Sequence, residues 1–212
     1  MVQLIKKDVA FNLKWALLLV LIAVIMPVVF YIDRGETRLI LWVYVIGNVL
    51  ANSHFVSKSC YLDDGAQTRK FLASLPVTRA QLVASKYLLG LLCAVISIAL
   101  TSLSSFALGL RPSVQGALIA ATYLLLYYSI FLGVFFRFNY SSAEKANTSL
   151  MMLTVMSVFI LDRSGIHLDG MTIDPAALIA GLGTAALIYA ASLFMSINVK
   201  WGRFSIHFSR TE

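Results

Sequence analysis

Residues 15–32 read WALLLVLIAVIMPVVFYI, an apolar run that contains no charged side chain. A helix needs about 20 such residues to cross the roughly 30 Å hydrocarbon core of a bilayer. The whole chain of 212 residues shares this character, with 59% hydrophobic residues, 13% charged residues and a mean hydropathy of +0.84. Soluble domains carry about 25% charged residues. The sequence therefore predicts an all-α integral membrane protein, and it excludes a soluble globule and a disordered chain.

Six apolar segments are the predicted membrane spans of one transmembrane domain that covers residues 1–212. They lie at residues 15–32, 39–56, 87–108, 115–136, 148–161 and 176–199. The fifth is only 14 residues long, so its length alone leaves its crossing undecided.

The distribution of basic residues predicts the orientation. The N-terminus, the segment 58–86, the loop after the fourth span and the C-terminal tail together hold 13 of the 17 Lys and Arg residues. Because cytoplasmic loops are rich in Lys and Arg, both termini are predicted in the cytoplasm of a multi-pass protein of the cell membrane. An even number of crossings follows, so the fifth segment must cross, completed by a partly re-entrant stretch over residues 162–175. The net charge of +7 then indicates anionic lipid, not nucleic acid, as the neighbour.

Residues 2–14 are predicted to form a short amphipathic helix along the inner leaflet. Ile5, Val9 and Leu13 recur on one face, and three lysines lie off it. Such a helix rests its apolar face in the membrane interface. The alternative is an ordinary positively charged flank of the first span.

The longest polar segment, residues 58–86, is expected to contain a short helix at the cytoplasmic face. Residues 58–87 read KSCYLDDGAQTRKFLASLPVTRAQLVASKY. A helix over residues 64–74 would place Phe71 and Leu72 on one side and Arg69 and Lys70 on another.

A bend and a new helix are predicted directly after it. Pro76 disfavours helix in the residue before it. Thr78 and Gln81 have the T-x-x-Q spacing of a capping box, which predicts a second helix that runs into the third span.

Polar and small residues inside the spans have two interpretations. Asn48 and Asn52 share a face of the second span, and Thr101 belongs to a polar stripe on the third that also holds Ser97, Ser104 and Ser105. They are candidates to line a substrate path, or they hydrogen-bond neighbouring helices. Small residues on the sixth span favour close helix packing, at Ala177, Gly181, Ala185, Ala186 and Ala190.

Several chemistries are excluded by missing motifs. The chain has no GxxxxGK[ST] loop, no GxGxxG after a strand and no HExxH. Cys60 and Cys93 form no disulfide framework or CxxC metal motif. Every Asp, Glu, Lys and Arg falls at a span end or in a loop, which weakens the interpretation as an ion-coupled carrier.

The order of motifs in the cytoplasmic segment resembles a known family. An acidic-Gly stretch at residues 63–65, Leu-Pro-Val-Thr-Arg at residues 75–79 and Ser-Lys-Tyr at residues 85–87 look like those of ABC-2 type exporter permeases. The Leu-Ile-Lys-Lys-Asp opening at residues 4–8 fits as well, and the resemblance covers the whole chain in span count and orientation. Within the family it looks most like small permeases of bacterial peptide or antimicrobial exporters, such as the phenol-soluble modulin exporter.

The resemblance implies roles for the two cytoplasmic elements. Residues 2–14 would be an elbow helix, and the segment from residue 63 to 74 would be a coupling helix that contacts a separate ATPase subunit. Its candidate contacts are Asp63, Asp64, Arg69, Lys70, Phe71 and Leu72. The chain would bind no cofactor itself, since ATP and Mg²⁺ would belong to the ATPase, and it would work with a second copy of itself or a related permease.

The resemblance also implies export of an amphipathic peptide, an antimicrobial or a lipid-like substrate. Two alternatives remain open from the residues alone. One is a secondary transporter or channel, and the other is a membrane-embedded enzyme with His54 or Cys60 as its reactive group. An ATPase gene beside this one would favour the exporter.

The charge distribution makes a topology prediction. A reporter fused after Glu212 should be cytoplasmic and one inserted at Gly170 external, as read by paired phosphatase and fluorescent reporters. An external C-terminus would show that the fifth segment does not cross.

Overall fold

The computed structural model describes residues 2–32, 43–65, 68, 77–110, 113–163 and 174–198. Within these ranges every regular element is a helix, so the predicted all-α class is confirmed. The elements are α1 (Val2–Phe11), α2 (Leu13–Ile32), the π-helical turn η1 (Val43–Gly47), α4 (Asn48–Asp64), α6 (Arg79–Ala107), α7 (Val114–Arg137), α8 (Tyr140–Arg163) and α9 (Pro175–Asn198).

Three described helices are long and apolar enough to cross a membrane: α6, α7 and α9. A fourth candidate arises if the bent pair of α1 and α2 counts as one span. The helix α8 extends the predicted fifth segment at both ends to 24 residues, or about 36 Å. Its length is therefore sufficient for a span. Its polar residues lower its mean hydropathy, so it is not among the three candidate spans. The count of six spans stays a prediction.

The N-terminal helix ends at a sharp break. Asn12 lies between α1 and α2, which meet at an angle of 79°, and its buried side chain donates to the Asp8 carbonyl at 3.0 Å. The buried face of α1 is formed by Leu4 and Asp8, and Asn12 at the break is buried as well. Val9 and Leu13, from the predicted apolar stripe, are exposed, because the protein-facing side is shifted by one residue towards Asp8.

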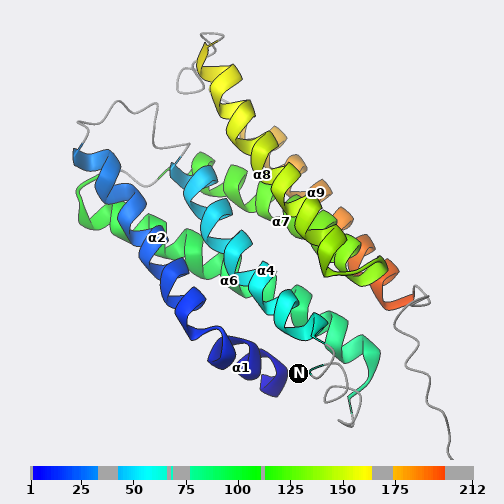
Figure 1. Cartoon of the computed structure of the whole chain (residues 1–212). Coiled ribbons are helices and arrows are strands. Elements are labelled where there is room, and N and C mark those ends of the chain that lie inside the picture. Colours follow the sequence, from blue (N-terminus) through cyan, green and yellow to red (C-terminus); the bar gives the residue numbers. More distant parts are fainter. Residues whose placement is uncertain are drawn as a thin grey trace, which may run out of the picture.

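The helices pack as two neighbouring groups around α6 and α7 (Figure 1). The helix α2 lies on α4 and α6, while α8 and α9 both pack on α7. The core where α4, α6 and α7 meet is apolar and aromatic, and its fully buried members include Val49, Phe55, Leu89, Leu124, Tyr128, Phe131 and Leu132.

Amide and hydroxyl side chains connect these helices inside the core. Asn52 donates to the Ser97 hydroxyl at 2.7 Å and accepts from the Tyr128 hydroxyl at 2.8 Å, so it joins α4 to α6 and α7. Asn48 donates to the Tyr44 carbonyl at 2.8 Å and approaches Thr101 Oγ1 at 3.4 Å. Such bonds hold helices together in lipid, where apolar burial between helices contributes little.

The predicted capping box at the start of α6 is confirmed. The Gln81 backbone N–H donates to Thr78 Oγ1 at 3.3 Å, and the Thr78 backbone N–H donates to the Gln81 side chain at 3.0 Å. Two of the unpaired amide groups at a helix start are thereby satisfied. Pro76, the other part of the predicted bend, lies outside the described residues.

The small-residue face of α9 is largely uncovered by the described part of the chain. Only Ala185 among its members is fully buried, while Ala177, Ala186 and Ala190 are exposed. A Cβ added at Gly181 would meet no described atom within 4 Å. Apart from Ala185, the members of this face have no close partner helix among the described residues, although α9 itself packs on α7.

The Asn52 contacts predict a stability difference between two tyrosine variants. Tyr128→Phe removes the donor to Asn52 and leaves a buried amide oxygen without it, at an expected cost of about 1 kcal/mol. Tyr31→Phe, at a half-exposed position on α2, is the matched control and should have no effect. The thermal midpoint of the detergent-solubilised protein measures both, and equal midpoints would contradict the assigned role of Asn52.

Candidate functional site

Four charged side chains meet where α1, the end of α4 and the start of α6 come together. Lys7 and Asp8 belong to α1, Asp63 to α4 and Lys86 to α6, and we name this set the ion ring. Lys86 is 1% exposed, Asp8 3% and Asp63 6%. A membrane protein this apolar thus buries charges from three helices at one point.

The charges alternate around the ring. Lys86 Nζ lies 2.6 Å from Asp63 Oδ2 and 2.8 Å from Asp8 Oδ2. Lys7 Nζ lies 2.8 Å from Asp63 Oδ1 and 3.4 Å from Asp8 Oδ1. Each ammonium therefore touches both carboxylates, and the ring has no net charge.

Lys86 has a further partner on α4. Its Nζ donates to Ser59 Oγ at 2.6 Å and to the Ser59 carbonyl at 3.2 Å. A lysine has three N–H donors, and here acceptors surround them. This matters because a buried charge is tolerated only when it is paired and hydrogen-bonded.

Helical spacing explains how the sequence builds the ring. Ser59 and Asp63 are four residues apart, so they lie on one face of α4. Leu4 and Asp8 of α1 and Asn12 at the break repeat at the same interval. The Thr78 cap fixes the start of α6, which sets the position of Lys86 about two turns later.

The ring keeps Asp63 ionised at neutral pH. Burial raises the pKa of Asp63, but the Lys86 ammonium and the hydrogen bonds from Lys7 and Lys86 outweigh burial, so the pKa falls below its ordinary value of 3.8. A carboxyl group whose pKa is lowered by folding stabilises the folded state at pH values above its ordinary pKa. That stabilisation is lost as the pH falls through the lowered value.

The structure places the predicted coupling residues as follows. Asp63 and Asp64 are the last two residues of α4, so they continue the second span helix and do not begin a separate one. Asp63, which the sequence assigned to the ATPase surface, is turned inward onto Lys7 and Lys86. Arg69, Lys70, Phe71 and Leu72 lie outside the described residues.

The sequence analysis did not identify three members of the ring as site residues. Lys7 and Lys86 were interpreted as part of the positive cytoplasmic charge, and Asp8 was assigned no role. One signal was available, because Asp8 is the sole acidic residue between Met1 and Tyr31. An acid within a basic N-terminal helix suggests a basic partner elsewhere in the chain.

A cluster of aromatic and basic side chains lies beside the ring. Trp15 of α2 stacks on His54 of α4 at 5.9 Å, and the Lys58 ammonium lies 5.6 Å from the Trp15 ring and 5.2 Å from the Tyr61 ring. Trp, Tyr and Lys of this kind mark the membrane–water interface. His54, a candidate for an enzyme, is engaged in this stack, and Cys60 is fully buried. A buried thiol is a poor nucleophile.

The predicted path residues Asn48, Asn52 and Thr101 are brought together in the core. All three are at most 1% exposed and lie between α4 and α6. Asn48 Oδ1 has no hydrogen-bond partner among the described residues. Their hydrogen bonds to neighbouring helices account for their burial, and a role along a substrate path stays a prediction.

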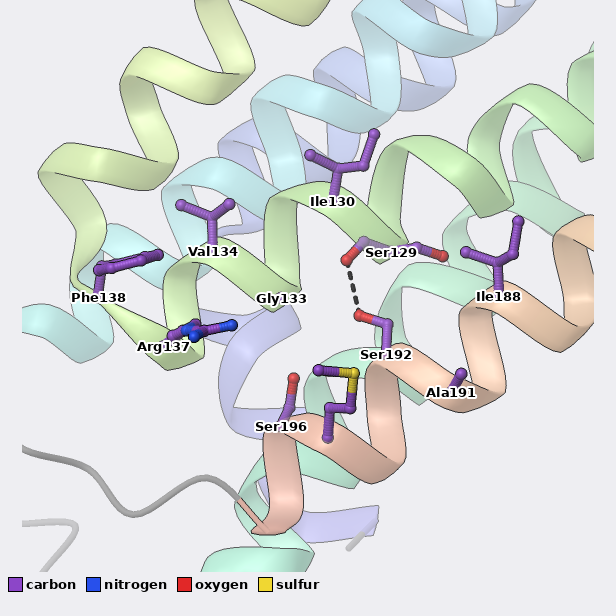
Figure 2. A pocket seen from close by; sticks show the side chains of 11 residues that line it. Ser129, Ile130, Gly133, Val134, Arg137, Phe138, Ile188, Ala191, Ser192 and Ser196 are labelled. Carbon is purple, nitrogen blue, oxygen red and sulfur yellow. Dashed lines mark hydrogen bonds between the residues drawn. The ribbon is translucent and has the colours of Figure 1, made fainter.

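An open groove between α7 and α9 is a further candidate site, which the sequence analysis did not anticipate (Figure 2). It has a volume of about 430 Å³ and mostly apolar walls, with Arg137 at one end. At its floor the Ser192 hydroxyl donates to the Ser129 carbonyl at 2.7 Å. A Cβ added at Gly133 would stand 3.0 Å from Ser192 Oγ, so a glycine permits this close approach of the two helices.

The ion ring predicts a charge-balance effect on stability. Lys86→Met leaves Asp8 and Asp63 buried without their main partner, which should cost roughly 3–5 kcal/mol. Lys86→Met combined with Asp8→Asn should cost less, because the Lys7–Asp63 pair remains intact and balanced. Lys6→Met, at an exposed position on α1, should change stability by under about 0.5 kcal/mol.

Thermal midpoints of the purified variants, measured in one detergent, test this order. A double variant no more stable than Lys86→Met would show that the two charges do not compensate each other.

Comparison with known proteins places this sequence in a family. The family described as ABC-2 family transporter protein matches residues 3–199, from the first turn of α1 to just beyond α9. No curated protein and no solved structure matched the chain, so the narrower resemblance to a peptide exporter has no support from these comparisons. With its apolar helices and a match over nearly its whole length, the chain is a multi-pass membrane protein that belongs to the ABC-2 transporter family.

Proposed function

We propose that this chain is the membrane subunit of an ATP-driven exporter, with six spans and both termini in the cytoplasm. The observation that carries the proposal is the family match over residues 3–199. Permeases of this family normally pair with an ATPase subunit and are not enzymes by themselves. The absence of a nucleotide-binding loop from the sequence agrees with ATP and Mg²⁺ being bound by that partner.

The shape of the N-terminal region supports an elbow at the inner leaflet. The helix α1 turns through 79° into α2 at Asn12. Its outward side presents Val9 and Phe11, with Leu13 following the break, while Lys6 is also exposed. Apolar side chains beside lysines suit a helix lying in the interface. Trp15, Lys58 and Tyr61 at the same end are typical of that interface.

The segment between α4 and α6 is the proposed contact with the ATPase. It leaves α4 at Asp64 and enters α6 through the Thr78 cap, so both of its ends are fixed in the structure. Phe71 and Leu72 are the proposed apolar contacts, and Arg69 and Lys70 the proposed charged ones. Asp64 completes the set at the end of α4. In this arrangement, nucleotide binding at the ATPase would move the segment and the helices attached to it.

A second copy, or a related permease, is the proposed partner within the membrane. The uncovered small residues of α9 and the adjoining α7–α9 groove are surfaces that another helix or lipid chains would cover. An amphipathic peptide, an antimicrobial or a lipid-like molecule is the proposed substrate class. It agrees with the apolar character of the exposed helix faces.

Co-purification with the ATPase tests the coupling segment. A buried aromatic anchor typically contributes about 2 kcal/mol or more to an interface, whereas an exposed charge contributes under about 1 kcal/mol. Phe71→Ala should therefore weaken recovery of the ATPase more than Arg69→Ala does, and export should fall with it.

The amount of each variant in the membrane is the control, since both changes lie outside the predicted spans. Normal recovery of the ATPase and normal export by both variants would remove residues 63–74 as the docking element.

A further inference from the structure

The ion ring includes one residue near each end of the segment that connects α4 to α6. Asp63 lies one residue before the segment leaves α4, and Lys86 lies about two turns after the Thr78 cap where the chain re-enters a helix. Their side chains meet at 2.6 Å. The two ends of the segment are therefore tied to each other directly, and a displacement of the segment acts on both at once.

The same ring attaches a third element, α1. Lys7 reaches Asp63 on α4, and Asp8 reaches Lys86 on α6, so α1 is joined to each end of the segment by one ion pair at 2.8 Å. Its other charge, Lys6, is exposed on the opposite side of the helix and offers a matched comparison.

Burial makes the ion pairs of the ring costly to separate. Moving one member of a buried pair away from its partner leaves an uncompensated charge in a poorly hydrated place, which is strongly unfavourable. The three buried members, Asp8, Asp63 and Lys86, therefore separate together or not at all, while Lys7, which is 21% exposed, ties α1 to Asp63 from the edge of the ring. An exposed salt bridge, by contrast, opens at a cost of under about 1 kcal/mol and transmits little.

We propose that Lys7, Asp8, Asp63 and Lys86 are positioning residues that make α1, the end of α4 and the start of α6 one rigid unit. This unit carries movement of the cytoplasmic segment to the N-terminal helix. The proposal rests on the proposed function for the source of that movement, whereas the rigid unit itself exists in the chain alone.

Hydrogen–deuterium exchange on the full chain in lipid nanodiscs tests the rigid unit without the ATPase. The variant Lys7→Gln with Asp8→Asn disconnects α1, keeps the Lys86–Asp63 pair and leaves the net charge unchanged. Exchange should rise in α1 and stay unchanged in α4 and α6. Lys6→Gln should behave as wild type, and Lys7→Arg with Asp8→Glu should restore protection. Unchanged exchange of α1 in the disconnected variant would overturn the proposal.

The second arm uses the complex with the ATPase that co-purifies, trapped with ATP, Mg²⁺ and vanadate. In the wild type, trapping should change exchange in residues 58–86 and in α1 together. In the disconnected variant the change should stop at residues 58–86, while the ATPase remains bound. A wild-type response confined to residues 58–86 would refute transmission to α1. Failure of any ATPase to co-purify would instead count against the proposed function, and the first arm would still decide the rigid unit.

Discussion

A lysine ammonium with almost no contact with solvent is the constraint around which the cytoplasmic end of this protein is built. The Lys86 ammonium can be buried on α6 only if carboxylates pair with it, and α4 and α1 supply these carboxylates. Each carboxylate is in turn balanced by Lys7. The ends of three helices are therefore fixed by one electrostatic requirement, and the packing of α1 against α6 follows from it.

Deeper in the helix bundle, uncharged groups do the corresponding work. Asn52, Ser97 and Tyr128 join three helices through hydrogen bonds of 2.7–2.8 Å. Next to the ring, Tyr87 follows Lys86 on α6 and reaches Ser192 at 2.8 Å and Ser196 at 3.0 Å, which joins α6 to α9. Among the described residues, the buried charges, Asp8, Asp63 and Lys86, thus lie at the end with the interface aromatics, and hydroxyl and amide groups serve where a charge would be costly.

The sequence was sufficient for the features that depend on local pattern. Apolar runs predicted the helices, and the T-x-x-Q spacing predicted the Thr78 cap. The hydrophobic periodicity predicted the wrong buried face for α1. It favoured burial of Val9 and Leu13, whereas the structure exposes both and buries Asp8. An acid counts as polar in any periodicity, and its burial is decided by Lys86, which lies 78 residues away in the chain. The spacing of residues within one helix does not predict partners that lie so far apart in the chain. For the same reason Asp63 was assigned to an outside partner.

The separation between Asp8 and Lys86 also bears on how the protein is made. The first helix leaves the ribosome long before Lys86 is synthesised, and during that interval Asp8 has no buried ammonium to meet. An ionised carboxylate is then better placed in water at the membrane surface than in the protein interior. We therefore expect α1 to stay at the interface while α2 and α4 insert, and to dock when the start of α6 arrives.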